Sequence, residues 1–279
     1  MPKSSYGTRP IAVVTGASRG LGRALASHLS AQGYLVIAGQ RAPAPKSCNF
    51  DIRHLRLDLA DEDSLEAFCH YLLDNLPCID VLVNNAASCP DHPGDTAKSA
   101  SYWNSVLQVN FFASVRLTES LLPLLQQSLK YPRVVNISSG DGELLFFSES
   151  LKPRLERLEA CNSTIQLIRE VESIANNILD DSFGIPIDEL IYNGQPAYKL
   201  SKALLNGYTR FASRRQERLQ SPEVAFVSVC PGDVDTEMAD FDAILISPED
   251  AVWRLASVLV ASKPCKTGVF LREGKEISW

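Results

Sequence analysis

The sequence predicts an α/β domain in which a doubly wound parallel sheet carries helices on both faces. Short apolar runs without polar alternation recur along the chain, as expected of strands that are buried on both sides. Segments with helical spacing of apolar residues separate these runs, and a glycine-rich loop joins the first run to the first helix. No repeat, low-complexity tract or linker divides the chain, so we expect one domain over residues 1–279.

The apolar and amphipathic patterns predict the elements in order. Strands are expected at residues 11–14, 34–38, 55–57, 81–83, 133–137, 224–229 and 268–271. Helices are expected at residues 21–32, 61–76, 102–127, 196–218 and 248–259. Gly33 is a good C-terminal cap for the first helix, and Pro196 suits the first turn of the helix that it begins.

Residues 141–195 depart from this alternation, because a single helix should link the strands on either side. The segment contains an amphipathic helix pattern and is predicted to be a helical insertion. Its apolar positions are Ile165, Ile168, Val171, Ile174 and Ile178.

Composition restricts the class of protein. The 279 residues are 45% hydrophobic and 22% charged, which is ordinary for a globular protein with a substantial core. The net charge of −6 argues against a nucleic-acid or anionic-lipid partner, and no apolar run is long enough to span a bilayer. The seven cysteines are odd in number and include no Cys-x-x-Cys, and the N-terminus lacks a secretory pattern. We therefore expect a cytoplasmic protein with free thiols and no metal. A metal site at Asp91, His92 and Asp95 is less favoured than a polar loop.

The glycine-rich loop at residues 15–22 lies between the first buried strand and the first helix. Glycines at this place permit a tight turn and a close approach of the backbone to a pyrophosphate, and the helix N-terminus offers N–H groups to phosphates. A plain turn is the alternative, but this context favours a dinucleotide site. The residues expected to contact the cofactor are Gly16, Ser18, Arg19, Gly20, Leu21 and Gly22.

Tyr198 and Lys202 lie four positions apart and therefore share one face of a helix. An ammonium beside a phenol stabilises the phenolate, so we expect the pair to lower the tyrosine pKa from its usual value of about 10. Chance often produces Tyr-x-x-x-Lys on solvated helices, and other motifs must decide its meaning.

The Gly-x-x-x-Gly-x-Gly loop, Asn84-Asn85-Ala86 and the Tyr198/Lys202 pair together resemble the short-chain dehydrogenase/reductase family, over about residues 11–270. The resemblance implies a Rossmann-like fold that binds NADP(H) and a small-molecule carbonyl substrate. It implies reduction of a ketone or aldehyde to an alcohol, with Tyr198 as general acid. The implied catalytic set is Asn110, Ser139, Tyr198 and Lys202.

Two roles within this set leave alternatives open. Ser139 matches the serine that hydrogen-bonds the substrate oxygen, although its neighbour Ser138 could hold that place, since only one of the two can face the site. Asn110 matches an asparagine that interrupts its helix and supports a water relay to Lys202. Without the other motifs, Asn110 would be an ordinary polar residue on a helix.

NADP is favoured over NAD because no carboxylate ends the second strand, where Arg41 stands, and because Arg19 adds a second cation. Alternatively, both arginines are simply exposed. The resemblance implies that Asp58 meets the adenine amino group, and a capping or turn role is its competitor. The further cofactor contacts implied are Leu59, Asn85, Ala86, Tyr198, Lys202, Pro231, Gly232, Val234 and Thr236.

The insertion resembles that of the monomeric carbonyl reductase-like subgroup, which includes menthone- and salutaridine-type reductases. We expect it to cover the helix face used for dimers elsewhere in the family, and hence a monomer; a surface excursion without effect on assembly is the alternative. One pocket wall is expected at Leu144, Phe146, Phe147 and Tyr192, and the other at Met238 and Phe241. Asp233 could favour a cationic substrate, but a solvent-facing side chain is preferred.

Three other functions compete with the reductase. The same site could run as an NADP-linked alcohol dehydrogenase, because direction depends on substrate and cofactor ratio. A non-catalytic NADP-sensing protein would be expected to have lost part of the catalytic set, which is intact here. A sugar-nucleotide epimerase would need a different glycine spacing and a larger C-terminal region.

Overall fold

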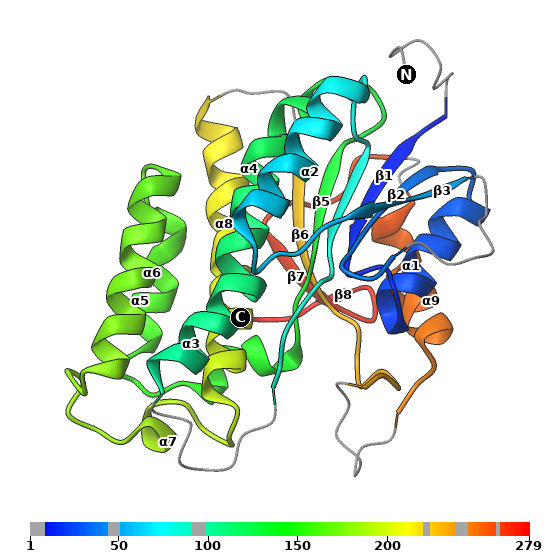
Figure 1. The fold of residues 1–279 in the computed structure, drawn as a ribbon. Helices are drawn as coiled ribbons and strands as arrows, with labels where there is room; N and C mark the ends of the chain where they lie inside the picture. The colour runs from blue at the N-terminus through cyan, green and yellow to red at the C-terminus, as the bar shows by residue number, and fades with distance from the viewer. Residues whose placement is uncertain (1–8, 44–50, 91–98, 220–223, 238–244, 261–262) are drawn as a thin grey trace.

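The structure is a computed structural model that describes residues 9–43, 51–90, 99–219, 224–237, 245–260 and 263–279. These residues form one eight-stranded sheet of order β3-β2-β1-β4-β5-β6-β7-β8 (Figure 1). β1 to β7 are parallel, and β8 pairs antiparallel with β7. The strands are β1 (Ile11–Thr15), β2 (Leu35–Gln40), β3 (Ile52–Arg56), β4 (Val81–Asn84), β5 (Arg133–Ile137), β6 (Ala225–Cys230), β7 (Val269–Arg272) and β8 (Lys275–Glu276).

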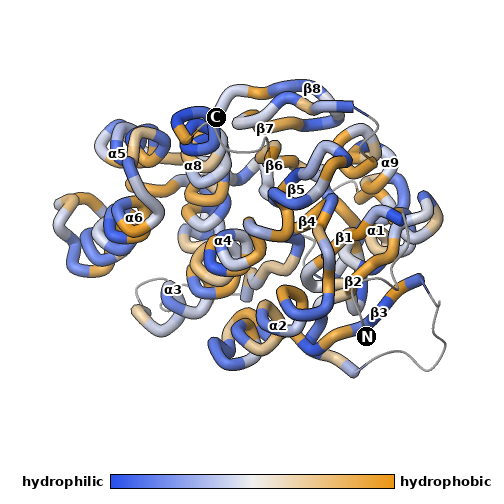
Figure 2. The backbone as a smooth tube through the Cα atoms, turned by 90° about the horizontal axis from the view of Figure 1, so that it is seen from above, coloured by the Kyte–Doolittle hydropathy of each residue, from blue (hydrophilic) through white to orange (hydrophobic). Residues whose placement is uncertain are grey.

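Helices cover both faces of the sheet, as predicted. One face carries α1 (Gly20–Ala31) and α9 (Pro248–Leu259). The other carries α2 (Glu62–Asn75), α4 (Ala113–Gln126) and α8 (Pro196–Leu219), as the view from above shows (Figure 2). A separate hydrophobic core fills each side of the sheet, so every central strand is buried on both faces.

Two strand predictions were incomplete. β3 begins three residues earlier than expected because it is an edge strand, and its polar, half-buried residues do not form an apolar run. The two-residue β8 was missed because Lys275 and Glu276 are exposed and carry no apolar signal.

The helix predicted at residues 102–127 is interrupted. It consists of α3 (Ala100–Leu107), a π-helical turn η3 (Gln108–Phe112) and α4. Asn110 lies in the π-helical turn, and such turns within α-helices are frequent at functional sites. The interruption implied by the family resemblance is therefore present.

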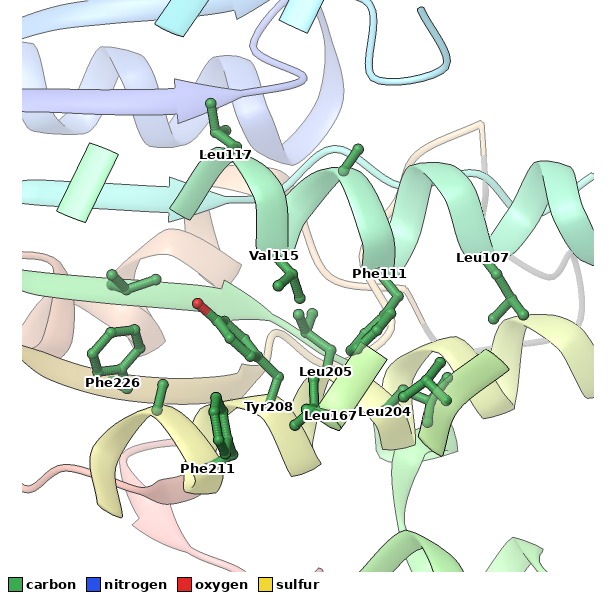
Figure 3. Packing of buried hydrophobic residues seen from close by; sticks show 14 of the residues in the cluster. Leu107, Phe111, Val115, Leu117, Leu167, Leu204, Leu205, Tyr208, Phe211 and Phe226 are labelled. Atoms are coloured by element: carbon green, nitrogen blue, oxygen red, sulfur yellow. The ribbon is translucent and has the colours of Figure 1, made fainter. Parts of the chain in front are cut away.

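The inserted segment packs against α8. It contains the short helices η4 (Gly140–Gly142), η5 (Leu144–Phe146), α5 (Lys152–Arg157), η6 (Leu158–Ala160), α6 (Thr164–Leu179) and α7 (Ile187–Leu190). A β-bridge between Phe147 and Ile191 closes its base. Leu158 lies against Gly207 of α8, where a Cβ would be only 3.1 Å from the leucine side chain. Leu167 of α6 joins Leu205 of α8 in the core (Figure 3).

Charged and polar groups also hold α6 to α4 and α8. Arg215 of α8 makes a two-pronged contact with Glu119 of α4, at 2.7 and 2.9 Å. The hydroxyl of Tyr208 donates to the same carboxylate at 2.8 Å, and Thr164 at the start of α6 hydrogen-bonds both Glu119 and Arg215. The insertion is therefore bound to the sheet-covering helices by a shared network.

The buried face of α6 differs in part from the predicted one. Its buried residues are Leu167, Val171, Ile174, Ala175 and Ile178. Ile165 belongs to the predicted apolar pattern but is 67% exposed in the first turn of α6. None of the helices in the described part of the chain is long and apolar enough to cross a lipid bilayer.

Replacing Ile174 by alanine should lower the free energy of unfolding by about 2–5 kcal/mol, because it deletes fully buried methyl groups between the insertion and the main domain. Ile165→Ala on the same helix is the matched control and should change the free energy of unfolding by less than about 0.5 kcal/mol. Urea unfolding monitored by circular dichroism measures both. Equal effects would mean that α6 is not packed as described.

Candidate active site

The predicted site residues gather at the carboxyl ends of the parallel strands. β1 lies between β2 and β4, so the strand order reverses there. Ligands of open α/β sheets bind at such a switch point, beyond the strand ends. The glycine loop follows β1, Asn85 and Ala86 follow β4, and Ser139 follows β5.

The glycine loop is closely packed against the turn after β4. Gly16 and Gly20 have positive φ angles of 67° and 51°, which side chains disfavour. A Cβ on Gly22 would lie 2.2 Å from the carbonyl oxygen of Gly16 and 2.5 Å from Nδ2 of Asn85, so only glycine fits. The Asn85 amide donates to the Thr15 carbonyl at 2.9 Å, and Thr15 Oγ1 accepts from the Ala86 N–H at 3.0 Å. This cradle leaves the N-terminus of α1 facing the site and fits a pyrophosphate.

The side chains of this loop divide into exposed and buried ones. Ser18 and Arg19 are exposed, and Leu21 is buried in the core beneath α1. The Arg19 guanidinium pairs with Glu237, so it is not the free cation that the sequence led us to expect. An incoming phosphate would have to compete with that carboxylate.

A cavity of about 290 Å³ adjoins the end of β2. Its charged and titratable lining residues are Arg41, Arg56 and His54. Burial lowers the pKa of His54, which leaves the two guanidinium groups as the cations of the cavity. Gln40, another lining residue, accepts a hydrogen bond at its Oε1 from His54 Nδ1 at 3.0 Å. Such a cavity can take an anionic group of a nucleotide.

The remaining cofactor candidates lie around this cradle. Asp58 accepts a hydrogen bond from the Ala60 N–H at 3.1 Å, so its carboxylate serves a turn, as the alternative interpretation held. Leu59 and Val234 are buried in the core, and only their backbone groups could meet a ligand. Thr236 packs over Gly20, and Pro231 and Gly232 begin the same turn, with Gly232 at φ 84°.

Asn110 joins three segments through its amide. Its Oδ1 accepts from the Ser88 N–H at 2.7 Å, and its Nδ2 donates to the Ser88 carbonyl at 2.9 Å. Nδ2 also donates to Ser201 Oγ at 3.0 Å, and Ser201 in turn donates to the Tyr198 carbonyl at 2.6 Å. Asn110 thus ties the π-helical turn to the loop after β4 and to the helix that carries Tyr198.

The structure brings Ser139, Tyr198 and Lys202 together. Lys202 is buried, donates from Nζ to the Ile137 carbonyl at 2.9 Å, and lies 5.3 Å from the centre of the Tyr198 ring. The Tyr198 hydroxyl hydrogen-bonds Ser139. Ser138 points the other way, is buried, and donates to the Lys202 carbonyl at 3.3 Å. Ser139 is therefore the serine that faces the site.

The expected lowering of the tyrosine pKa is wrong for this site. Burial raises the pKa of Tyr198, Cys89 and Asp141 act in the same direction, and the hydrogen bond from Ser139 offsets only part of this rise. Burial also lowers the pKa of Lys202 to about 8. The phenol therefore keeps its proton at neutral pH, because loss of solvation outweighs the attraction of the ammonium.

Comparison with known proteins decides the family. The model of the short chain dehydrogenase family matches residues 10–150, which hold the cradle, Asn110 and Ser139. This chain is a short-chain dehydrogenase. As a member of that family it is an oxidoreductase that acts on CH–OH and C=O groups with a nicotinamide cofactor.

Similar proteins cover nearly the whole of this short-chain dehydrogenase. The (+)-neomenthol dehydrogenase of Arabidopsis thaliana is 27% identical over 96% of this chain and 97% of its own length. Carbonyl reductase [NADPH] 1 of Mus musculus is 29% identical over 87% of this chain and 88% of its own. The solved structure of salutaridine reductase from Papaver somniferum has the same fold, with a TM-score of 0.73 at 23% identity over 94% of this chain and 99% of that one.

The expected substrate walls of this short-chain dehydrogenase are only partly accessible. Phe147 is fully buried in the core and Leu144 nearly so, which leaves Phe146 and Tyr192 as accessible apolar residues. Asp233 is exposed, in agreement with the preferred solvent-facing interpretation. Several expectations fall outside the described residues, namely those for Met238, Phe241, Asp91, His92 and Asp95. Within the described part, no three His, Cys, Asp or Glu side chains are placed to hold a metal ion.

Three polar residues beside the short-chain dehydrogenase site escaped the sequence analysis. Ser201 receives the Asn110 amide, Asp141 receives the Ser139 hydroxyl, and Lys199 pairs with Asp141. Lys199 and Ser201 lie between Tyr198 and Lys202, so their positions could have been suspected. Asp141 lies far from them in sequence and carried no periodic or motif signal.

Proposed function

We propose that this chain reduces a ketone or aldehyde to an alcohol with NADPH, and that Tyr198 is the general acid. The observation that carries the proposal is a protonated phenol beside Ser139 and a buried ammonium, at the carboxyl end of the sheet. A site that holds its proton at neutral pH suits proton donation to a developing alkoxide.

The chemistry divides between the cofactor and the side chains. A bound nicotinamide supplies the hydride for the carbonyl carbon. Tyr198 gives its hydroxyl proton to the carbonyl oxygen as negative charge grows there, and the phenolate that remains is stabilised by the Lys202 ammonium. Asp141 Oδ2 accepts the single hydroxyl hydrogen of Ser139 in the structure. When a carbonyl oxygen is bound, Ser139 turns this hydrogen to that oxygen, and the hydrogen bond lowers the energy of the transition state. Asn110 holds the helix of Tyr198 in place through Ser201.

The raised pKa of Tyr198 favours reduction over the alternative of alcohol oxidation. Oxidation needs a group that accepts the hydroxyl proton, and a tyrosine whose pKa lies above its usual value is rarely deprotonated at neutral pH. The same residues perform both directions, so the raised pKa changes the rates near pH 7 and leaves the overall equilibrium unchanged.

Tyr198→Phe should lower kcat for carbonyl reduction by at least about 100-fold, since it removes the proton donor. The Kd for NADPH, measured by quenching of protein fluorescence, should change by less than about threefold. Tyr71→Phe, at an exposed tyrosine of α2 outside the site, serves as the control. Turnover of Tyr198→Phe close to that of the wild type would exclude Tyr198 as the acid.

NADPH selectivity is proposed on the cavity beside β2. Arg41 and Arg56 line it, no carboxylate is among its lining residues, and carbonyl reductase [NADPH] 1 carries this cofactor in its name. A guanidinium attracts the 2′-phosphate, whereas a carboxylate in its place would repel it.

Arg41→Ala should raise the KM for NADPH about tenfold and leave the KM for NADH nearly unchanged, because it removes a charge-assisted contact to the 2′-phosphate. Arg169→Ala, an exposed arginine of α6, is the control with the same loss of charge. Both are measured by cofactor oxidation at 340 nm. A wild-type enzyme that is faster with NADH would contradict the proposed selectivity.

We also propose a monomer that acts in the cytoplasm as a single domain. The inserted helices occupy the face of α4 and α8 through Leu158, Leu167 and the Glu119–Arg215 pair, so that face is covered within one chain (Figure 3). Cys69, Cys78, Cys161 and Cys230 are free thiols, which fits a reducing compartment.

Multi-angle light scattering should give the monomer mass of about 30.6 kDa at all concentrations tested. The reason is that the apolar face available for pairing is already buried. A concentration-independent dimer would contradict the proposed role of the insertion in assembly.

A further inference from the structure

Lys199 and Asp141 form an ion pair next to Ser139, the proposed catalytic serine. Lys199 Nζ is 3.2 Å from Asp141 Oδ1, and its side chain is only 6% exposed. The ammonium also donates to the Asn193 carbonyl at 3.2 Å and lies 5.2 Å from the centre of the Phe146 ring. A buried cation with these partners is held in one place.

The second oxygen of the carboxylate faces the reaction site. Ser139 Oγ donates to Asp141 Oδ2 at 3.2 Å, and the Asp141 N–H donates back to Ser139 Oγ at the same distance. A continuous chain of polar contacts therefore runs from Lys199 of α8 through Asp141 and Ser139 to the Tyr198 phenol.

We propose that Asp141, held by Lys199, is a positioning residue that fixes the Ser139 side chain beside the Tyr198 phenol and places a negative charge next to Tyr198 and Lys202. This inference rests on the proposed function, since it concerns the same acid. Its consequence is a site biased towards proton donation, and so towards reduction.

The titratable groups around the Tyr198 phenol support an effect of the Asp141 charge on the pKa of Tyr198 and of Lys202. Tyr198 is faced by Lys202 from its own helix, Cys89 from the loop after β4, Cys230 from β6, and Asp141 after β5. Asp141 is the carboxylate among these groups. Its negative charge raises the pKa of a neighbouring phenol and of a neighbouring ammonium. Burial raises the pKa of Tyr198 most, with Cys89 and Asp141 adding to it, and Asp141 also opposes the lowering of the Lys202 pKa by burial.

Two other charged side chains lie near this turn. Glu143 pairs with Arg272 of β7, and the Arg272 guanidinium lies against Gly140. This second pair balances its own charge, so removal of Asp141 changes the net charge of the turn by one.

The ionisation of Lys202 tests the charge effect without any turnover. Full-length protein labelled with [ε-¹³C]lysine is titrated by NMR, and the Lys202 resonance is assigned by its absence in Lys202→Arg. Asp141→Asn should lower the Lys202 midpoint by about half a pH unit or more, since it removes a nearby negative charge. Lys199→Met should raise it, because the carboxylate loses its counter-ion.

Glu149→Gln is the matched control for the titration. Glu149 is the carboxylate of an exposed pair with Lys152, at 2.5 Å, and its loss should leave the Lys202 midpoint unchanged. An unchanged midpoint in Asp141→Asn, or shifts of the same sign in Asp141→Asn and Lys199→Met, would overturn the charge effect. The titration needs no substrate, so this outcome is separate from a failure of the proposed reaction.

Kinetics test the orientation of Ser139. Asparagine keeps an oxygen that can accept the Ser139 hydroxyl, whereas alanine does not. At its own optimal pH, Asp141→Asn should keep kcat within about threefold, and Asp141→Ala should lose about tenfold in kcat with little change in KM. The pH profile of alcohol oxidation by Asp141→Asn should shift to lower pH. Equal kcat values for the alanine and asparagine variants would overturn the positioning role.

Discussion

Burial of the Lys202 ammonium is the constraint on which the geometry of the site depends. A buried charge is costly unless it is hydrogen-bonded, and the Ile137 carbonyl at the end of β5 is the partner that meets this need. α8 must therefore lie close to the turn after β5. Gly142 makes this possible, since a Cβ there would lie 2.8 Å from the carbonyl carbon of Lys202. Ser139 of the turn after β5 and Tyr198 of α8 lie beside each other because the helix approaches this turn so closely.

A row of buried, hydrogen-bonded polar side chains fixes the position of α4 and α8 relative to the sheet. Asn84 of β4 donates to Thr118 of α4 and to Asn136 of β5, and Asn136 donates to Thr209 of α8, which bonds Ser228 of β6. These distances are 2.7–2.9 Å. Because these groups are buried and serve as one another's partners, sliding of α4 or α8 would leave buried polar groups unsatisfied. The inserted helices then cover the outer face of this layer.

How far the sequence predicts this molecule depends on how local each signal is. Strands buried on both faces, such as β1, and capped helices, such as α9, were predicted almost to the residue, because apolar runs and caps are local. Edge strand β3 and the exposed Ile165 were not, since their burial depends on neighbours distant in sequence. Motif spacing predicted Asn110, Tyr198 and Lys202 together with Ser139, and the fold brings these four residues to one end of the sheet. Asp141 was missed because only the fold brings it to Lys199.

The Tyr198/Lys202 pair shows why helix spacing alone cannot define its chemistry. On a solvated helix, an ammonium one turn away stabilises the phenolate and lowers the tyrosine pKa. In the folded protein both side chains lose contact with solvent, which disfavours the charged form of each. The charged form of tyrosine is the deprotonated one, so burial raises its pKa. The charged form of lysine is the protonated one, so burial lowers its pKa. The pKa of Tyr198 rises above its usual value while that of Lys202 falls to about 8, so the two values move apart. Lys202 is then the stronger acid of the two, so transfer of a proton from its ammonium to the Tyr198 phenolate, once the phenol has given up its own proton, is favourable. It is the tertiary fold, through burial and through the turn that carries Asp141, that sets this order.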